Sequence, residues 1–303
     1  MTVPAVSVVM PVYNSAAYLA QAVESILAQD YRDFEFVIVD DGSTDASPQI
    51  LGKYAAADAR VRVVTRPNTG IVGALNDGLK AARAPLVARM DADDISMAAR
   101  FGKQVEHMRK NPGCVAVGSK ILLIDADGWP ICEMCQQRTH KEIDEVNLRA
   151  GGAAINHPSV MYRREAVLKV GGYRQEMIYA EDLDLWLRLA EVGELYNLPE
   201  VLVHYRMHAQ SISHARAIEQ RHKWCRAVAD ARKRRGAPSP LDLLPADTVS
   251  RAVKVSDHHI RWAWQALMAG NVPTARKHAF TGLRMKPFSV ETWRLAACAA
   301  RGH

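Results

Sequence analysis

The chain has 303 residues, of which 49% are hydrophobic and 24% charged, and its formal net charge is +6. This length allows one large α/β domain with a smaller appendage, and the composition excludes a fibrous or disordered chain. No run approaches the roughly 18 apolar residues of a membrane-spanning helix, and the first ten residues predict a strand, not a signal peptide. The five scattered cysteines argue against a disulfide framework and for the reducing cytoplasm.

The first part of the chain alternates apolar strands with amphipathic helices. Strands are predicted at 6–11, 34–39, 61–65 and 86–90, and helices at 18–28, 47–56 and 72–82. Continuous apolar strands interleaved with helices indicate a mostly parallel sheet that is covered on both faces. Ligands of such sheets bind beyond the carboxyl ends of the strands. The sequence therefore predicts an α/β, Rossmann-like domain with its site at those strand ends.

The second part of the chain is less regular and then becomes helical. The pattern predicts a helix at 100–110, a strand at 115–124, a polar segment flanking the site at 125–152, a strand at 157–162 and a helix at 181–192. Beyond about residue 212 only helices are expected, with an antiparallel pair at 260–269 and 274–285 joined through Gly270 and Asn271. A core domain is thus expected over 1–212, divided near residue 95, with a helical region at 213–303.

The strand at 86–90 runs directly into three carboxylates, those of Asp91, Asp93 and Asp94. Carboxylates so close together repel one another, and desolvation beside a sheet increases the penalty, so a divalent cation would stabilise them. Oxygen ligands favour Mg²⁺ or Mn²⁺, which can also bridge a diphosphate. The alternative is a solvated turn, because Asp is common in turns.

A second acidic cluster, at residues 40–45, follows the strand at 34–39. A carboxylate at a strand end can accept a hydrogen bond from a nucleobase imide or a ribose hydroxyl, and Gly42 lets a backbone come close. A plain strand-to-helix turn is the alternative. The occurrence of two such clusters after two apolar strands favours a shared site.

Two later segments carry further candidates. Glu181 and Asp182 open a predicted helix, where a carboxylate could act as a general base or could simply favour the helix N-terminus. In the segment 204–208, a histidine could ligate a metal and Arg206 could pair with phosphate, or both histidines could lie on the surface after a strand.

Two compositional features leave more than one interpretation. Cys132 and Cys135, with His140 after them, lack the second ligand pair of a closed zinc site, so free thiols are predicted. The segment 215–235 holds eight Arg and Lys against two acidic residues. It is either a solvated helix face or a contact with an anionic membrane surface or anionic acceptor. No recognition motif supports nucleic-acid binding.

Taken together, the motifs resemble the family 2 glycosyltransferases of the GT-A fold, in particular bacterial enzymes of cell-surface polysaccharide assembly. The matching segments, in family order, are VSVVMPVYN (6–14), FVIVDDGSTD (36–45), NTG (68–70), NDG (76–78), MDADD (90–94), HPSVMYRR (157–164), GGY (171–173), EDLDLWLR (181–188) and YRMH (205–208). They extend over about residues 5–212, and their joint occurrence is far more specific than any one of them.

The resemblance implies roles for individual residues. The nucleotide would contact Pro11, Val12, Tyr13, Asn14, Asp40, Asp41, Asn68, Gly70, Asn76, Asp91 and Ala92. Asp41 would read a uracil-like imide. The metal, Mn²⁺ or Mg²⁺, would be held by Asp93, Asp91, Asp94 and His208, with Asp93 favoured. Asp182, next to Glu181, matches the general base of inverting members. Ala74 and Leu75 stand where many relatives carry Lys or Arg, which puts phosphate contacts from that loop in doubt.

The implied activity is transfer of a sugar, with inversion, from a nucleoside-diphosphate donor to a hydroxyl of a glycan or lipid-linked acceptor. UDP is favoured over GDP and TDP. Residues 1–95 would bind the donor and 96–212 the acceptor. The expected location is the cytoplasm, with peripheral contact to the inner face of the membrane through 215–235.

Two other classes compete with this interpretation. A nucleotidyltransferase would need a Gly-rich basic phosphate loop after the first strand, and the segment 12–15 is not one. A non-catalytic sugar-nucleotide-binding protein would not need Asp93 and Asp182.

Overall fold

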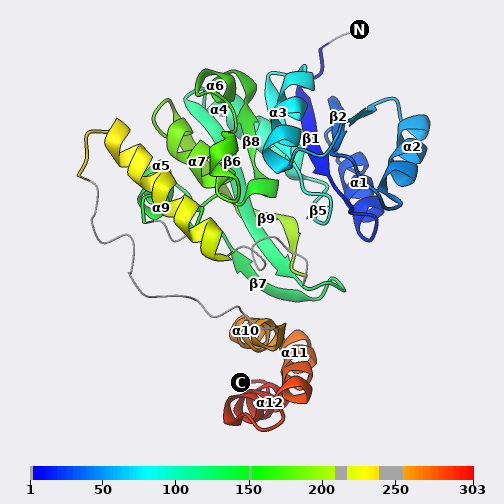
Figure 1. Ribbon diagram of the computed structural model, residues 1–303, viewed down its shortest axis with the longest axis vertical. Helices are drawn as coiled ribbons and strands as arrows, with labels where there is room; N and C mark the ends of the chain where they lie inside the picture. The colour runs from blue at the N-terminus through cyan, green and yellow to red at the C-terminus, as the bar shows by residue number, and fades with distance from the viewer. Residues whose placement is uncertain (1–2, 150–151, 209–216, 239–254) are drawn as a thin grey trace. The chain divides into compact units, whose positions relative to one another are not determined.

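The computed structural model describes residues 3–149, 152–208, 217–238 and 255–303 (Figure 1). They belong to two compact units. The first unit takes the described residues within Met1–Ile121, Cys135–His204 and Glu219–Pro245, and the second those within Leu122–Met134, Tyr205–Ile218 and Ala246–His303. The domain boundary expected near residue 212 stays a prediction.

The described strands form one nine-stranded sheet in the order β3-β2-β1-β4-β8-β6-β9-β5, with β7 paired to β6. The strands are β1 Val6–Val12, β2 Phe34–Asp40, β3 Val61–Thr65, β4 Leu86–Arg89, β5 Ile95–Ser96, β6 Cys114–Ile124, β7 Pro130–Met134, β8 Met161–Arg163 and β9 Glu194–Arg206. Strands β1 to β4 are parallel, whereas β8 is antiparallel to both β4 and β6. The predicted parallel, Rossmann-like half is confirmed.

Helices cover both faces of this sheet. They are α1 Leu19–Leu27, α2 Ser47–Ala57, α3 Ile71–Ala81, α4 Arg100–Lys110, α5 His140–Asn147, α6 Arg164–Lys169, α7 Glu181–Leu189 and α9 Ala217–Arg234, with short 3₁₀ turns at His157–Ser159 and Gln175–Met177. Alternate residues of β1 face opposite ways. Val8 packs in one buried cluster with Phe101 of α4, and Val9 in another with Leu79 of α3 and Trp186 of α7. This alternation explains why the strand is apolar throughout.

Two stretches differ from the sequence-based expectation. The segment 125–152 contains β7 and α5, and α5 begins with a capping box in which Thr139 and Glu142 satisfy each other's backbone amides. The strand predicted at 157–162 exists but begins later than expected, because His157–Ser159 form a 3₁₀ turn and β8 covers Met161–Arg163. Pro158 within this turn cannot donate to a strand ladder.

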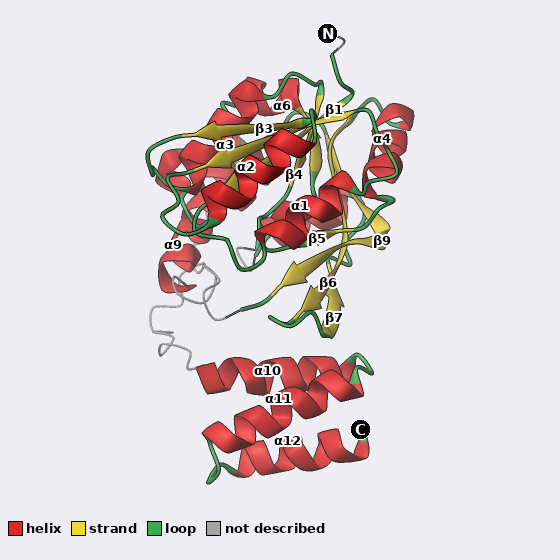
Figure 2. Cartoon of the chain, turned by 90° about the vertical axis from the view of Figure 1, so that its right-hand side faces the viewer, coloured by secondary structure: helices red, strands yellow, loops and turns green. Residues whose placement is uncertain are grey.

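The second unit contains three C-terminal helices, α10 Val255–Met268, α11 Val272–Met285 and α12 Val290–Arg301 (Figure 2). Helices α10 and α11 pack together and are joined through Gly270, whose φ of 78° favours glycine, and Asn271. In the part of the chain that the structure describes, no helix combines the length and apolar character needed to cross a bilayer.

Candidate functional site

Three parallel strands end at one edge of the sheet and bring the two acidic clusters together. Val12 at the end of β1 pairs with Asp40 at the end of β2. On the other side of β1, the Met90 amide donates to the Val9 carbonyl at 3.1 Å, so β4 ends beside β1. The loops that begin at Asp41 and at Asp91 therefore leave from neighbouring strands, as expected for a parallel sheet.

The Asp91, Asp93 and Asp94 carboxylates each offer an oxygen, and these oxygens lie within 4.8 Å of one another. Asp94 is buried, whereas Asp91 and Asp93 are partly exposed. Burial raises the pKa of Asp91; the charge of Arg89 opposes this shift and that of Asp93 adds to it. A compact set of carboxylate oxygens is what Mg²⁺ or Mn²⁺ takes as ligands, so the residues present fit the predicted ion.

The cysteine pair does not add a second metal site within the described residues. Cys132 and Cys135 form no disulfide, and the compact ligand group found among the described residues includes neither of them. Instead, Nδ1 of His140 accepts a hydrogen bond from the Leu195 amide at 3.3 Å.

Arg89 is a site residue that sequence analysis missed. Its side chain is only 3% exposed, and it forms an ion pair with Asp91. Buried Arg100 in turn donates to the Arg89 carbonyl at 2.8 Å and to the Val160 carbonyl at 3.1 Å, which fixes the end of β4. The available signal was a basic residue inside an otherwise apolar strand, two positions before Asp91.

Glu181 and Asp182 occupy the first turn of α7 and belong to the same electrostatic neighbourhood. Burial raises the pKa of Asp182; the Leu183 amide, which donates to its Oδ1 at 2.7 Å, and Arg89 oppose this shift, and the charge of Asp91 adds to it. Burial, followed by the charge of Asp182, raises the pKa of Glu181 to about 7. The fold thus joins the acidic motif after β4 with the start of α7.

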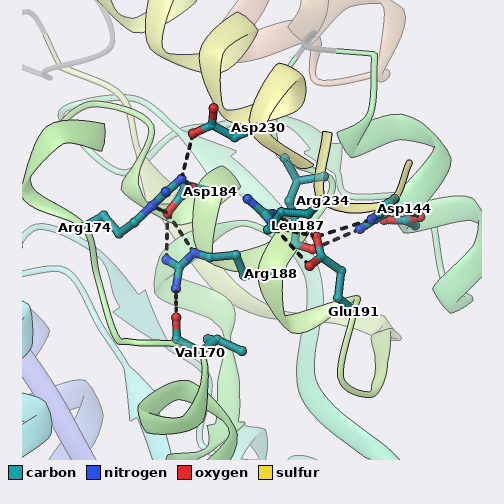
Figure 3. A network of polar contacts seen from close by, with 10 residues as sticks. Asp144, Val170, Arg174, Asp184, Leu187, Arg188, Glu191, Asp230 and Arg234 are labelled. Carbon is teal, nitrogen blue, oxygen red and sulfur yellow. Dashed lines mark hydrogen bonds and ion pairs between the residues drawn. The ribbon is translucent and has the colours of Figure 1, made fainter. Parts of the chain in front are cut away.

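A buried ion network fixes α7 at Asp184, two residues after Asp182 (Figure 3). Asp184 is fully buried and binds two guanidinium groups, accepting from Arg174 Nε at 3.0 Å and from Arg188 Nη2 at 2.7 Å. Arg188 also donates to the Val170 carbonyl at 2.7 Å, and Arg174 reaches Asp230 of α9 at 3.3 Å. The Asp184 carboxylate is therefore used in holding α7 in place, and the role of Asp182 in chemistry stays a prediction.

Polar contacts of Asp41 join the loop after β2 to the loop after β3. The buried Asp41 carboxylate accepts from the Gly70 amide at 2.9 Å and the Thr69 amide at 3.2 Å, and pairs with Arg66. A carboxylate has about four lone-pair sites, so these contacts leave capacity for a nucleobase. Gly42 has a φ of 75°, and a Cβ there would lie 2.9 Å from the Asn68 nitrogen, so this position requires glycine.

Asn76 joins α3 to the loop before the 3₁₀ turn Gln175–Met177. Its Nδ2 donates to the Tyr173 carbonyl at 2.8 Å, and its Oδ1 accepts from the Tyr173 amide at 3.0 Å. The Tyr173 hydroxyl contacts Nε2 of buried His157 at 2.9 Å. The amide groups of Asn76 are thus used within the protein, and its contact with a nucleotide stays a prediction.

The remaining predicted nucleotide contacts differ in exposure. Pro11, Val12, Asp40 and Ala92 are buried, while Tyr13, Asn14 and Asn68 are exposed. Asn14 has a positive φ of 48° and accepts from the Thr44 amide at 2.8 Å, which ties the ends of β1 and β2 together. Of these residues, Tyr13 is the large exposed side chain, 51% exposed, that could stack on a base.

Two other predictions concern later parts of the chain. His208 belongs to the second unit, and its role as a metal ligand stays a prediction. Of the basic segment 215–235, residues 215 and 216 lie outside the described residues. Arg234 in this segment pairs with Glu191 at 2.8 Å, and Arg235 with Asp144 at 2.7 Å.

Comparisons with known proteins assign the chain to a family. The model of glycosyl transferase family 2 matches residues 7–171. The O-antigen biosynthesis glycosyltransferase WbnJ of Escherichia coli is 34% identical over 211 residues, covering 68% of this chain and 81% of WbnJ.

Two solved structures share the fold. The mannosyltransferase PcManGT of Pyrobaculum calidifontis, in complex with GDP-Man and Mn²⁺, has a TM-score of 0.58 at 20% identity, covering 99% of this chain and 81% of that one. TarS of S. aureus, in complex with UDP-GlcNAc, has a TM-score of 0.60 at 17% identity, covering 98% and 92%. The matched family model, the sequence relative and the shared GT-A-like architecture lead to one conclusion: the chain belongs to glycosyl transferase family 2.

Proposed function

We propose that the protein is a metal-dependent, inverting glycosyltransferase of cell-surface polysaccharide biosynthesis. It would transfer a sugar from a UDP-sugar to a hydroxyl group of a glycan or lipid-linked acceptor. The observation that carries the proposal is the convergence of Asp91, Asp93 and Asp94 with Asp182 at one edge of the sheet. The name of WbnJ supports the biosynthetic assignment, and the UDP-GlcNAc bound to TarS supports the donor class.

The donor would bind across the ends of β1, β2 and β4. The exposed ring of Tyr13 offers a stacking surface, and Asp41 offers a hydrogen-bond acceptor for the imide of uracil. The diphosphate would then extend towards the acidic motif, where Asp93 and its neighbours would hold the ion. A bound Mn²⁺ or Mg²⁺ supplies positive charge that stabilises the departing diphosphate.

Asp182 would act as the general base. Its raised pKa makes it a stronger base than an exposed aspartate, and it lies at a helix N-terminus fixed by the Asp184 network. The Asp182 carboxylate takes the proton of the acceptor hydroxyl while that oxygen bonds to the anomeric carbon. The bond from that carbon to the nucleotide oxygen breaks, and the pair of electrons leaves with the nucleoside diphosphate. A single displacement inverts the anomeric centre.

The first test concerns the donor and the metal. Thermal stability of the full chain is measured against a panel of UDP-, GDP- and TDP-sugars, each with and without Mn²⁺. We expect a UDP-sugar to raise Tm only when Mn²⁺ is present, because the ion offsets repulsion between the diphosphate and the carboxylates. Stabilisation by a GDP-sugar alone would overturn the UDP assignment and keep the enzyme class.

The second test concerns the base. Asp182→Asn removes the proton acceptor without changing side-chain size, so we expect donor turnover to fall about 10²-fold or more with the thermal shift retained. Asp33→Asn, at an exposed position, is the matched control and should leave both unchanged. Near-normal turnover in Asp182→Asn would refute the base, and donor binding without turnover in the unaltered chain would indicate a binding protein.

A further inference from the structure

The turn between α11 and α12 exposes a cluster of large apolar side chains. The exposed fractions are 100% for Phe288, 83% for Val290, 59% for Trp293 and 49% for Met285. The opposite sides of the same helices are buried in the second unit, as shown by Ala279 and Leu295, which are fully covered. Clustered apolar exposure on a folded helical unit marks an interaction surface.

Helix α12 arranges this surface in two stripes. At 100° per residue, Val290, Trp293 and Ala297 fall on one side of the exposed face, and Arg294 and Arg301 fall directly beside them. The indole Nε1 of Trp293 donates to the Pro287 carbonyl at 2.8 Å. This bond satisfies the polar edge of the ring and holds the turn, so the apolar part of the ring faces solvent.

The charge around the turn is positive. Residues 255–303 hold seven Arg and Lys against two acidic residues, Asp257 and Glu291. Asp257 is paired with Lys286, whereas Arg284 and Arg294 are exposed and flank the apolar residues 285–293 in the sequence. A partner that covers this surface must therefore be apolar in its interior and anionic at its boundary.

We propose that the α11–α12 turn docks on an anionic lipid bilayer. Phe288, Val290 and Trp293 enter the interface between headgroups and acyl chains, and Arg284 and Arg294 pair with lipid phosphates. Aromatic side chains with adjacent Arg are the composition of helices that lie in a membrane interface. Phe288 is fully exposed at the tip of a turn, which suits insertion into a fluid surface.

The basic helix α9, the candidate from sequence, is less suited to this role. Its buried side packs in the first unit, where Val228 and Ala231 join the cluster of Leu183 and Leu187. Several of its cations already have partners there, Arg234 with Glu191 among them. The α11–α12 turn offers both apolar side chains and exposed cations, so we assign the membrane contact to it.

The test is co-sedimentation of the full chain with vesicles. Binding is expected to vesicles of equal parts phosphatidylglycerol and phosphatidylcholine, and not to pure phosphatidylcholine, with weakening at high salt. Phe288→Ser should lower the partition coefficient about tenfold, as expected when a large apolar group no longer leaves water. Arg284→Gln with Arg294→Gln should weaken binding to anionic vesicles in the same direction.

Matched controls separate this surface from general stickiness and charge. Met268→Ser alters an 87% exposed side chain at the last residue of α10, before the other connection of the bundle, and should bind like the parent. Arg226→Gln with Lys233→Gln removes two exposed cations of α9 and should also retain binding.

Equal binding by Phe288→Ser and the parent would overturn the proposal. So would loss of binding in the α9 variant, or self-association that Phe288→Ser abolishes, measured by light scattering without lipid.

Discussion

Arg89 places a buried positive charge within a group of carboxylates. It pairs with Asp91, and its charge opposes the rise that burial causes in the pKa values of Glu181 and Asp182. One guanidinium cannot neutralise this many carboxylates, which is a physical reason for the site to take up a divalent cation. Arg89 already forms an ion pair with Asp91. The better candidates for direct metal ligands are therefore Asp93 and Asp94.

Replacement of Arg89 by Met should destabilise the protein. The change leaves Asp91 without its cation, and breaking a buried ion pair costs roughly 3–5 kcal/mol; since Asp91 is 25% exposed, we expect about 2 kcal/mol. Urea unfolding of the full chain gives the value. Adding Asp91→Asn to Arg89→Met should recover part of the loss, and an additive double variant would contradict the proposed coupling.

At the residue scale, sequence predicted the carboxylates better than their partners. Asp91, Asp93 and Asp182 stand in motifs whose chemistry is readable from residue type and spacing. Arg89 was missed because a single charged residue in an apolar strand gives no sign of what it faces. The use of the Asn76 amide by Tyr173 was equally hidden, because the two residues meet only through the tertiary fold.

Helix α7 is positioned by charge more than by its length. It has nine residues, too few to be stable alone in water. Asp184 binds Arg174 on the preceding loop and Arg188 on the next turn, and α9 adds the contact of Asp230 (Figure 3). Helix α9 of the first unit thus helps to hold in place the helix that carries Asp182.

Asp184→Asn should therefore loosen α7 and reduce catalysis. Removing the charge leaves two buried guanidinium groups poorly paired, and we expect a loss of about 3 kcal/mol in stability with a fall in turnover larger than any change in donor affinity. Denaturant unfolding and separate kcat and KM values measure this. Asp230→Asn is the control, since its partly exposed 3.3 Å contact is worth under about 1 kcal/mol. Equal losses in the two variants would show that Asp184 is no special anchor.

Element prediction succeeded where the pattern is strictly local. The apolar runs of β1 and β2 and the helical spacing of α1 are readable because each is buried on the expected faces. The start of β8 was placed too early, at 157 instead of Met161, because the turn around Pro158 directly precedes the apolar residues of the strand. Strand β7 was missed because it is only five residues long, begins with a proline and lies in a segment that is polar around it; its pairing with β6 makes it a strand.

At the scale of the whole chain, Asp125 ties together segments that are distant in sequence. The residue is buried at the end of β6 and accepts from the Trp129 amide at 2.9 Å, which closes the turn before β7. Its other oxygen pairs with Lys277 and lies 3.1 Å from Nε2 of His278, both on α11. This tie explains why residues 122–134 and the C-terminal helices form one compact unit. Sequence could not reveal it, because nothing in the polar segment after 124 marks one aspartate as buried.

Asp125→Asn should destabilise this unit in a pH-dependent manner. Burial alone would raise the pKa of Asp125, but hydrogen bonds from His278 and Lys277 outweigh it and hold the pKa well below its usual range. A depressed carboxyl pKa contributes stability above the unfolded-state pKa of about 3.9 and loses it as the pH falls towards the folded-state pKa. We expect the variant to be less stable by about 2 kcal/mol at pH 7 and the difference to shrink by pH 3. Denaturant unfolding at both pH values checks this.

The control is Asp127→Asn. Asp127 is a 71% exposed partner of Lys277, so this variant should cost under about 1 kcal/mol. A difference between parent and Asp125→Asn that stays constant with pH would show that the charge of Asp125 is not what holds the unit together.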